Sequence, residues 1–154
     1  MKKIIYLFLT ILLLFTFSSC KKKDFDYSNL DSIVYENILN LNGNYIVVAY
    51  QANCENCDNL KDTIYDYYNY TKKNDSAMKI YGININLAIN KDICLLSTDT
   101  YKTDMLNTTD YQNIKVKSTP SLFVINNHKL VKIISDYNTR KPVTDSKTYL
   151  NSLM

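Results

Sequence analysis

A short apolar run that is followed by two cysteines most constrains how this chain folds. Residues 45–50 read Tyr-Ile-Val-Val-Ala-Tyr, with no alternation of apolar and polar side chains. A run of this kind is typical of a strand in a sheet that is covered on both faces. Cys54 and Cys57 follow after a short polar turn, and apolar residues then recur at helical spacing: Leu60, Ile64, Tyr67 and Tyr68. The pattern predicts a strand, a turn with two cysteines, and a helix from Cys57 to about Lys72.

The rest of the chain alternates helical and strand patterns. Residues 86–109 show no clear periodicity and predict loop and short helix. Turn residues and periodicity place the other elements. We predict an amphipathic helix at 30–41 capped by Ser28 or Asn29, strands at 78–85, 121–125 and 129–134, a hairpin turn at 126–128, and a last helix capped by residues 144–146. The chain after residue 30 is therefore predicted to be one α/β domain.

The position of the two cysteines gives them a chemical role. A cysteine in the first turn of a helix lies where unpaired backbone N–H groups and the positive end of the helix dipole converge. Both stabilise a thiolate, which is the reactive form of cysteine. With two residues between them, Cys54 and Cys57 can cycle between a dithiol and a disulfide, although a fixed disulfide has the same sequence pattern.

Two segments of the chain resemble the thioredoxin superfamily. Residues 45–57 are similar to its strand, turn and Cys-x-x-Cys motif, and residues 110–127 are similar to its proline-led strand and hairpin. The resemblance implies a central mixed sheet flanked by helices, with an extended connector before the proline strand. It also implies a cis bond between Thr119 and Pro120, lying against the active-site disulfide. Cys54 and Cys57 would then be the catalytic pair, and Thr119 with Pro120 would shape the substrate groove.

The sequence departs from this family around the cysteines. Asn53 replaces the usual Trp, Glu55-Asn56 replaces Gly-Pro, and Val48 stands where many thioredoxins have a buried acid. The charge of Glu55 disfavours a thiolate on Cys54 and partly offsets the effect of the helix end. We therefore assign redox tuning to Glu55 and Asn56, and expect a reductant rather than a strong oxidant.

The N-terminus predicts export. Residues 1–19 have a basic start, an apolar run too short to span a membrane, and a small-residue end, as in a signal peptide. Residues 17–20 resemble the lipobox of bacterial lipoproteins, in which Cys20 receives the lipid. An ordinary cleaved signal and a retained anchor are the alternatives. We predict a signal peptide at 1–19, a lipidated Cys20 with a polar tether at 20–29, and a thioredoxin-like domain at 30–154.

Charge and the remaining cysteines exclude other classes. Lysines 2, 3 and 21–23 supply five of the positive charges, so residues 24–154 carry a net charge of −2, which does not favour nucleic acid. A structural zinc site typically has four Cys or His ligands. Besides Cys54 and Cys57, the predicted mature domain contains one further cysteine, Cys94, and one histidine, His128. We expect no metal and no cofactor. Cys94 is interpreted as an apolar filler and His128 as a residue of the hairpin turn.

Together these features predict a thiol–disulfide oxidoreductase that is tethered by lipid to the extracytoplasmic side of the cell membrane. Its partners would be exported proteins that carry disulfides or dithiols, the membrane, and an unidentified redox partner. The alternative is a lipid-anchored binding or accessory module of the same fold, in which the Cys54–Cys57 disulfide is not catalytic.

Overall fold

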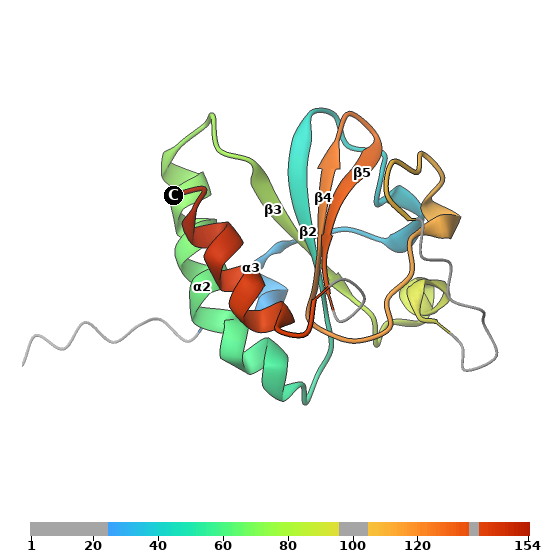
Figure 1. The fold of residues 1–154 in the computed structure, drawn as a ribbon, viewed down its shortest axis with the longest axis horizontal. Helices are drawn as coiled ribbons and strands as arrows, with labels where there is room; N and C mark the ends of the chain where they lie inside the picture. Colours follow the sequence, from blue (N-terminus) through green and yellow to red (C-terminus); the bar gives the residue numbers. More distant parts are fainter. Residues whose placement is uncertain (1–24, 96–104, 136–138) are drawn as a thin grey trace, which may run out of the picture.

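A computed structural model describes residues 25–95, 105–135 and 139–154. In this part of the chain a mixed sheet has the strand order β1-β3-β2-β4-β5 (Figure 1). Strands β1 and β3 run parallel to β2, and β4 and β5 continue the sheet by antiparallel pairing. The elements are β1 (Asp31–Ser32), β2 (Asn44–Tyr50), α2 (Glu55–Lys73), β3 (Lys79–Asn84), β4 (Ser121–Asn126), β5 (Lys129–Ile134) and α3 (Pro142–Asn151). The predicted mixed sheet flanked by helices is confirmed.

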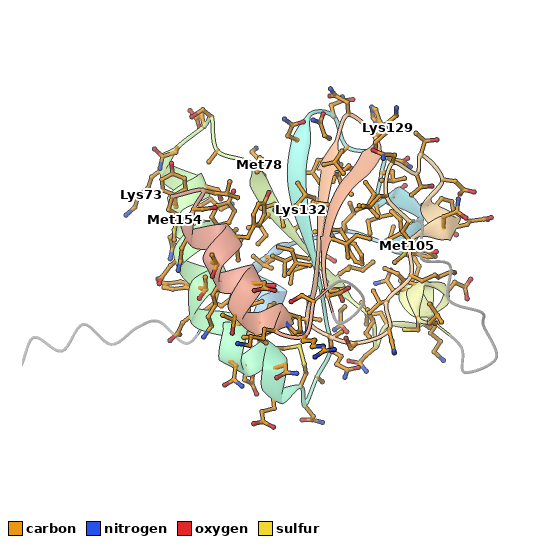
Figure 2. All side chains as sticks on the ribbon, in the orientation of Figure 1. Lys73, Met78, Met105, Lys129, Lys132 and Met154 are labelled. Atoms are coloured by element: carbon orange, nitrogen blue, oxygen red, sulfur yellow. A yellow bond between two sulfur atoms is a disulfide. The ribbon has the colours of Figure 1, made fainter. Side chains whose placement is uncertain are left out.

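The two faces of the sheet are covered differently. Helices α2 and α3 pack together on one face, and short 3₁₀ helices with loops cover the other (Figure 1). The 3₁₀ helices of this second face are η2 (Tyr35–Asn37), η3 (Ala88–Ile93) and η4 (Tyr111–Asn113). Met78 and Met154 lie on the helix side, and Met105 lies on the opposite side (Figure 2). We call these the helix face and the 3₁₀ face.

Strand β2 is buried on both faces, as its composition predicts. Ile46 and Val48 belong to the core cluster of the helix face, whereas Val47 and Ala49 belong to that of the 3₁₀ face. All four side chains are fully buried. Strand β2 is therefore the central strand of the sheet, and the turn that follows it places the cysteines at the end of the sheet.

The predicted helix at 30–41 is wrong. Residues of this segment form β1 and η2 instead, and the Ile33 N–H bonds to the Gly82 carbonyl at the sheet edge. The Asn40 side chain donates to the Glu36 carbonyl and to the Asn37 side chain. Asn side chains that bond to nearby groups in this way compete with a regular helix. Apolar spacing alone was therefore a poor guide here.

The boundary between tether and domain is also wrong. Phe25 and Tyr27, which we placed in the tether, are buried in the core of the helix face. Residues 27–29 form a 3₁₀ helix, η1 (Tyr27–Asn29), which is capped by Asp26 rather than capping a helix itself. The folded domain therefore extends at least to Phe25, which shortens the predicted tether.

The last helix begins earlier than predicted. Helix α3 starts at Pro142 with Lys141 as its N-cap, so residues 144–146 lie inside it. Proline suits the first helical position because a backbone N–H at that position would have no partner within the helix, so nothing is lost by its absence. The hairpin turn is confirmed, with Asn127 and His128 both at positive φ.

Some predictions fall outside the described residues. These are the signal peptide, the lipidation of Cys20 and part of the connector, residues 96–104. Among the described residues, no helix is both long enough and apolar enough to cross a membrane.

Candidate redox site

The turn between β2 and α2 places Cys54 and Cys57 at the end of the sheet, where they form a disulfide. Asn53 has a φ of 54°, a left-handed conformation that Asn adopts more readily than most residues. The Asn86 side chain, beyond the end of β3, accepts a hydrogen bond of 2.8 Å from the Ala52 N–H. The conformation just before Cys54 is therefore set by one local preference and one long-range bond.

The Cys54 sulfur caps helix α2. Cys54 is the N-cap residue, and its Sγ accepts a hydrogen bond of 3.1 Å from the Cys57 N–H. Its carbonyl accepts from the Asp58 N–H at 3.0 Å, as the first bond of the helix. In the dithiol form, the same N–H group and the helix dipole stabilise negative charge on Cys54. The sulfur that is expected to attack thus has the environment of a nucleophile.

The loop before β4 meets this sulfur from the other side. Thr119 Oγ1 lies 3.3 Å from Cys54 Sγ, and the Thr119 carbonyl oxygen lies 3.5 Å from it. The bond between Thr119 and Pro120 is cis, which is the form that the resemblance implies. Cys54, Cys57, Thr119 and Pro120, which were singled out from separate parts of the sequence, lie in one place.

The residues around the pair differ in exposure. Glu55 and Asn56 are exposed in the first turn of α2, where solvent screens the charge of Glu55. Val48 is fully buried in the core cluster that contains both cysteines. Cys54 is 9% exposed and Cys57 2%. Cys54 is therefore the more accessible of the two residues, and its sulfur is the one that we expect to attack.

Tyr27 is a site residue that the sequence analysis missed. Its hydroxyl donates a buried hydrogen bond of 2.7 Å to the Cys57 carbonyl. Burial, and then the charges of Asp58 and Asp26, raise the pKa of Tyr27 well above its usual value, so the hydroxyl remains a donor. The alternation of Phe25, Asp26 and Tyr27 was the available signal, because it marks one apolar face.

Cys94 and His128 are not part of this site. Cys94 has a half-buried free thiol that packs against the core of the 3₁₀ face, and its backbone forms an isolated parallel β-bridge with Val116. His128 lies in the hairpin turn, and its Nδ1 is 2.7 Å from the Leu39 carbonyl oxygen. Within residues 25–95, 105–135 and 139–154, no three His, Cys, Asp or Glu side chains gather as metal ligands would.

Comparison with known proteins identifies the fold. No protein family and no curated protein matches the sequence. A chain solved in work on the thiol resolving mechanism of yeast mitochondrial 1-Cys peroxiredoxin via glutathione/thioredoxin systems aligns with a TM-score of 0.53 and 10% identity. The alignment covers 84% of this chain and 100% of that chain. Oxidised mitochondrial thioredoxin 3 from Saccharomyces cerevisiae aligns with a TM-score of 0.53 and 11% identity, over 82% and 98% of the two chains.

The protein therefore has a thioredoxin-like fold. At such low identity the likeness shows the fold alone, and the chemistry must be argued from the residues of this chain. The Cys54–Cys57 disulfide at the start of α2 is the feature that, on this fold, supports thiol–disulfide redox chemistry.

Proposed function

We propose that the protein is a thiol–disulfide oxidoreductase that exchanges disulfides with exported proteins. The observation that carries this proposal is the position of Cys54. Its sulfur is bonded to Cys57, caps the N-terminus of α2 and lies beside Thr119 at the end of the sheet. These contacts supply a stabilised nucleophile and, three residues along the chain, a second sulfur that can displace the product.

In the reducing direction, the Cys54 thiolate attacks one sulfur of a substrate disulfide. A bond forms between Cys54 and that sulfur, and the other substrate sulfur leaves as a thiolate. Cys57 then attacks the Cys54 sulfur, so the protein disulfide forms and the second substrate thiolate leaves. Two electrons pass from the protein dithiol to the substrate. Thr119 and Pro120 form the wall beside Cys54 against which the substrate chain would lie, and no cofactor is needed.

The pair is proposed to be a reductant rather than a strong oxidant. The exposed charge of Glu55 next to Cys54 makes the thiolate less favourable than the helix end alone would. Equilibration with glutathione would measure the reduction potential. We expect a value nearer to about −270 mV than to about −120 mV.

Reduction of insulin tests the activity. Purified protein with an added reductant is expected to turn over, Cys54→Ser to be inactive, and Cys57→Ser to accumulate a mixed disulfide with the substrate. If wild-type protein and Cys54→Ser behave alike, the exchange activity is refuted. The protein would then be an accessory module with a fixed disulfide.

The proposed place of action is the extracytoplasmic side of the membrane, with a lipid on Cys20. Four residues lie between Cys20 and Phe25, the first buried side chain in the part of the chain that the structure describes. The five residue steps from Cys20 to Phe25 span about 17 Å when fully extended. A short tether of this kind would keep the redox site close to the bilayer. Cys20→Ala is expected to move the protein from the membrane fraction to the soluble fraction. An unidentified partner at the membrane or outside it would recharge the pair.

A further inference from the structure

The segment before the sheet is fastened to the active-site helix by aromatic rings. We call residues 25–29 the N-terminal clasp. The Phe25 ring lies 5.2 Å from the ring of Tyr65 and 6.3 Å from that of Tyr68, both on α2. The Tyr27 ring stacks on Tyr50, the last residue of β2, at 4.8 Å with an interplanar angle of 19°. The clasp therefore contacts both elements that flank the cysteine turn.

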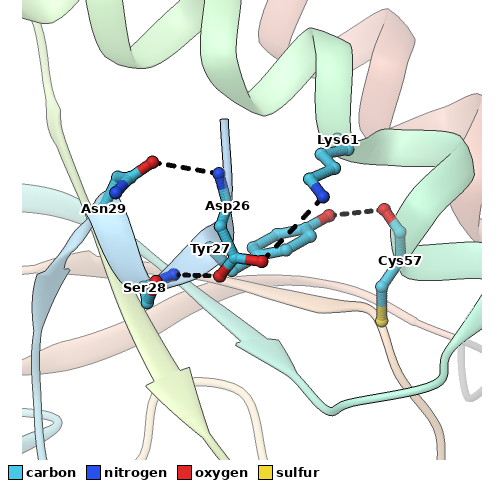
Figure 3. Close-up of polar contacts among 6 residues, drawn as sticks. All are labelled: Asp26, Tyr27, Ser28, Asn29, Cys57 and Lys61. Atoms are coloured by element: carbon cyan, nitrogen blue, oxygen red, sulfur yellow. Dashed lines mark hydrogen bonds and ion pairs between the residues drawn. The ribbon is translucent and has the colours of Figure 1, made fainter. Parts of the chain in front are cut away.

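Polar contacts fix the clasp at its other side. The Asp26 carboxylate accepts from the Ser28 N–H at 2.8 Å, and the Asp26 N–H donates to the Asn29 side chain at 3.0 Å. Asp26 also pairs with Lys61 of α2 at 3.9 Å. Lys61 lies one turn after Cys57, so the clasp contacts the first part of the helix at two successive turns (Figure 3).

Tyr27 makes the contact nearest to the redox pair. Figure 3 shows the Cys57 carbonyl turned toward the Tyr27 hydroxyl, while the Cys57 sulfur points away from that hydroxyl. Gly82 of the neighbouring strand β3 leaves room for the Tyr50 ring on which Tyr27 stacks. A Cβ at Gly82 would lie 3.1 Å from Tyr50 and 3.3 Å from Leu30. The hydroxyl is thus held at the backbone of Cys57 by packing on several sides.

We propose that Tyr27 is a positioning residue for Cys57, the resolving cysteine. By holding the Cys57 carbonyl, its hydroxyl fixes the first turn of α2 so that the Cys57 sulfur faces the Cys54 sulfur. This inference rests on the proposed disulfide exchange and adds a residue to it. Cys57 is almost fully buried and sits on a helix, so the backbone decides where its sulfur lies.

The step that depends on this contact is the second displacement. While Cys54 is bonded to the substrate, the protein disulfide is absent and no longer holds Cys57 in place. Attack needs the two sulfurs near contact and in line, and small misplacements slow such reactions strongly. The first attack, by the Cys54 sulfur, does not involve the Cys57 carbonyl. Tyr27 should therefore affect the second step and not the first.

A chromogenic disulfide separates the two steps. Reduced full-length protein, with Cys20 and Cys94 changed to Ala, is mixed with one equivalent of dithiobis(nitrobenzoate). The first nitrothiobenzoate is released by Cys54 at a rate that depends on reagent concentration, and the second is released by Cys57 at a rate that does not. In Tyr27→Phe we expect the second release to be roughly fivefold slower and the first to be unchanged, as for loss of one buried hydrogen bond.

The chain offers a matched control in Tyr67→Phe. Tyr67 is fully buried on α2, and its hydroxyl donates to the Met78 carbonyl at 2.8 Å, far along the helix from the cysteines. The variant loses the same type of bond in the same core cluster, so it should lose comparable stability while both release rates stay at wild-type values. An equal slowing of the second release in both variants would refute the positioning role and leave only a general effect of stability.

Asp26→Ala provides a second test of the inference in case Tyr27→Phe does not fold. Asp26→Ala keeps the Tyr27 ring but removes the η1 cap and the pair with Lys61. It should slow the second release by a smaller factor and leave the first unchanged. A normal second release in both Tyr27→Phe and Asp26→Ala would overturn the inference while leaving the exchange activity intact. If wild-type protein releases no nitrothiobenzoate at all, both the inference and the proposed function fail.

Discussion

The two faces of the sheet are both covered by other parts of the chain, but by different kinds of element. The helix face is covered by the long helices α2 and α3, and the 3₁₀ face by η2, η3, η4 and loops (Figure 1). Each face nevertheless buries a full set of apolar side chains against β2. Only a long helix has a strong dipole and a first turn with several unpaired N–H groups. The redox pair therefore lies at the N-terminus of α2, on the helix face.

Tyrosine side chains are buried in the cores of both faces, where each places a large apolar ring and one polar hydroxyl. On the helix face, Tyr27 and Tyr67 donate to backbone carbonyls, and on the 3₁₀ face Tyr45 donates to the Ile38 carbonyl at 3.1 Å. Burying a hydroxyl costs little when it finds such a partner. Of these three tyrosines, Tyr27 is the one whose hydroxyl bonds to a cysteine of the site.

Truncation of one core residue on each face should show the largest difference. Leu60 in α2 and Ile38 beside η2 are both fully buried. We expect Leu60→Ala to lower the free energy of unfolding by about 3 kcal/mol and Ile38→Ala by about 2 kcal/mol, since short turns close over a cavity more easily than a long helix does. Urea unfolding would measure both. A larger loss in Ile38→Ala would show that the 3₁₀ face is the more rigid one.

The same contrast explains which elements the sequence predicts. Strand β2, helix α2 and the β4–β5 hairpin were predicted because they have clear periodicity or turn residues. The segment at 30–41 has apolar residues at helical spacing, yet it pairs with Gly82 at a sheet edge and forms η2. A short edge strand makes its bonds with a distant part of the chain, and such bonds leave no local pattern.

The site shows the same limit. Cys54, Cys57, Thr119 and Pro120 were found because each belongs to a motif with a chemical reason. Tyr27 was assigned to a tether because its bond partner lies 30 residues away. Its importance depends on the packing of the clasp on α2, which only the structure shows.

Removing the Thr119 hydroxyl should have the next largest effect. Thr119→Val keeps the shape of the side chain but removes the oxygen that lies 3.3 Å from Cys54 Sγ. A hydroxyl donor stabilises a thiolate by about 1 kcal/mol, so alkylation of reduced Cys54 at neutral pH should slow about fivefold. Iodoacetamide labelling with mass spectrometry measures this rate. Thr71→Val is the control, because Thr71 is as buried as Thr119 but lies near the other end of α2, where its hydroxyl donates to the Tyr68 carbonyl at 2.8 Å. Unchanged labelling in Thr119→Val would show that the hydroxyl does not support the thiolate.

Alkaline pH should weaken the helix face through Tyr67. Burial, followed by nearby Tyr149 and Tyr70, raises the pKa of Tyr67 from 10.0 to about 12. The stability that comes from the neutral phenol is complete below about pH 10 and is lost as pH rises toward about 12. Tyr67→Phe has no phenol to ionise there, so its stability should fall less steeply than that of wild type over this range. The urea unfolding midpoints of both proteins, measured between about pH 10 and about pH 12, would test this prediction. If the two midpoints fall in parallel with pH, the prediction is contradicted.

The smallest effect should come from the thiol near the 3₁₀ face. Burial raises the pKa of Cys94, although the nearby charge of Lys115 opposes this. At pH 8, Cys94 is then less ionised than an exposed cysteine and should react more slowly with iodoacetamide than the thiol of a short peptide does. Cys94→Ala should leave insulin reduction unchanged, because Cys94 packs against the core of the 3₁₀ face, whereas Cys54 and Cys57 belong to the core of the helix face. A loss of activity in this variant would mean that the two faces are coupled, and that the 3₁₀ face does more than close the core.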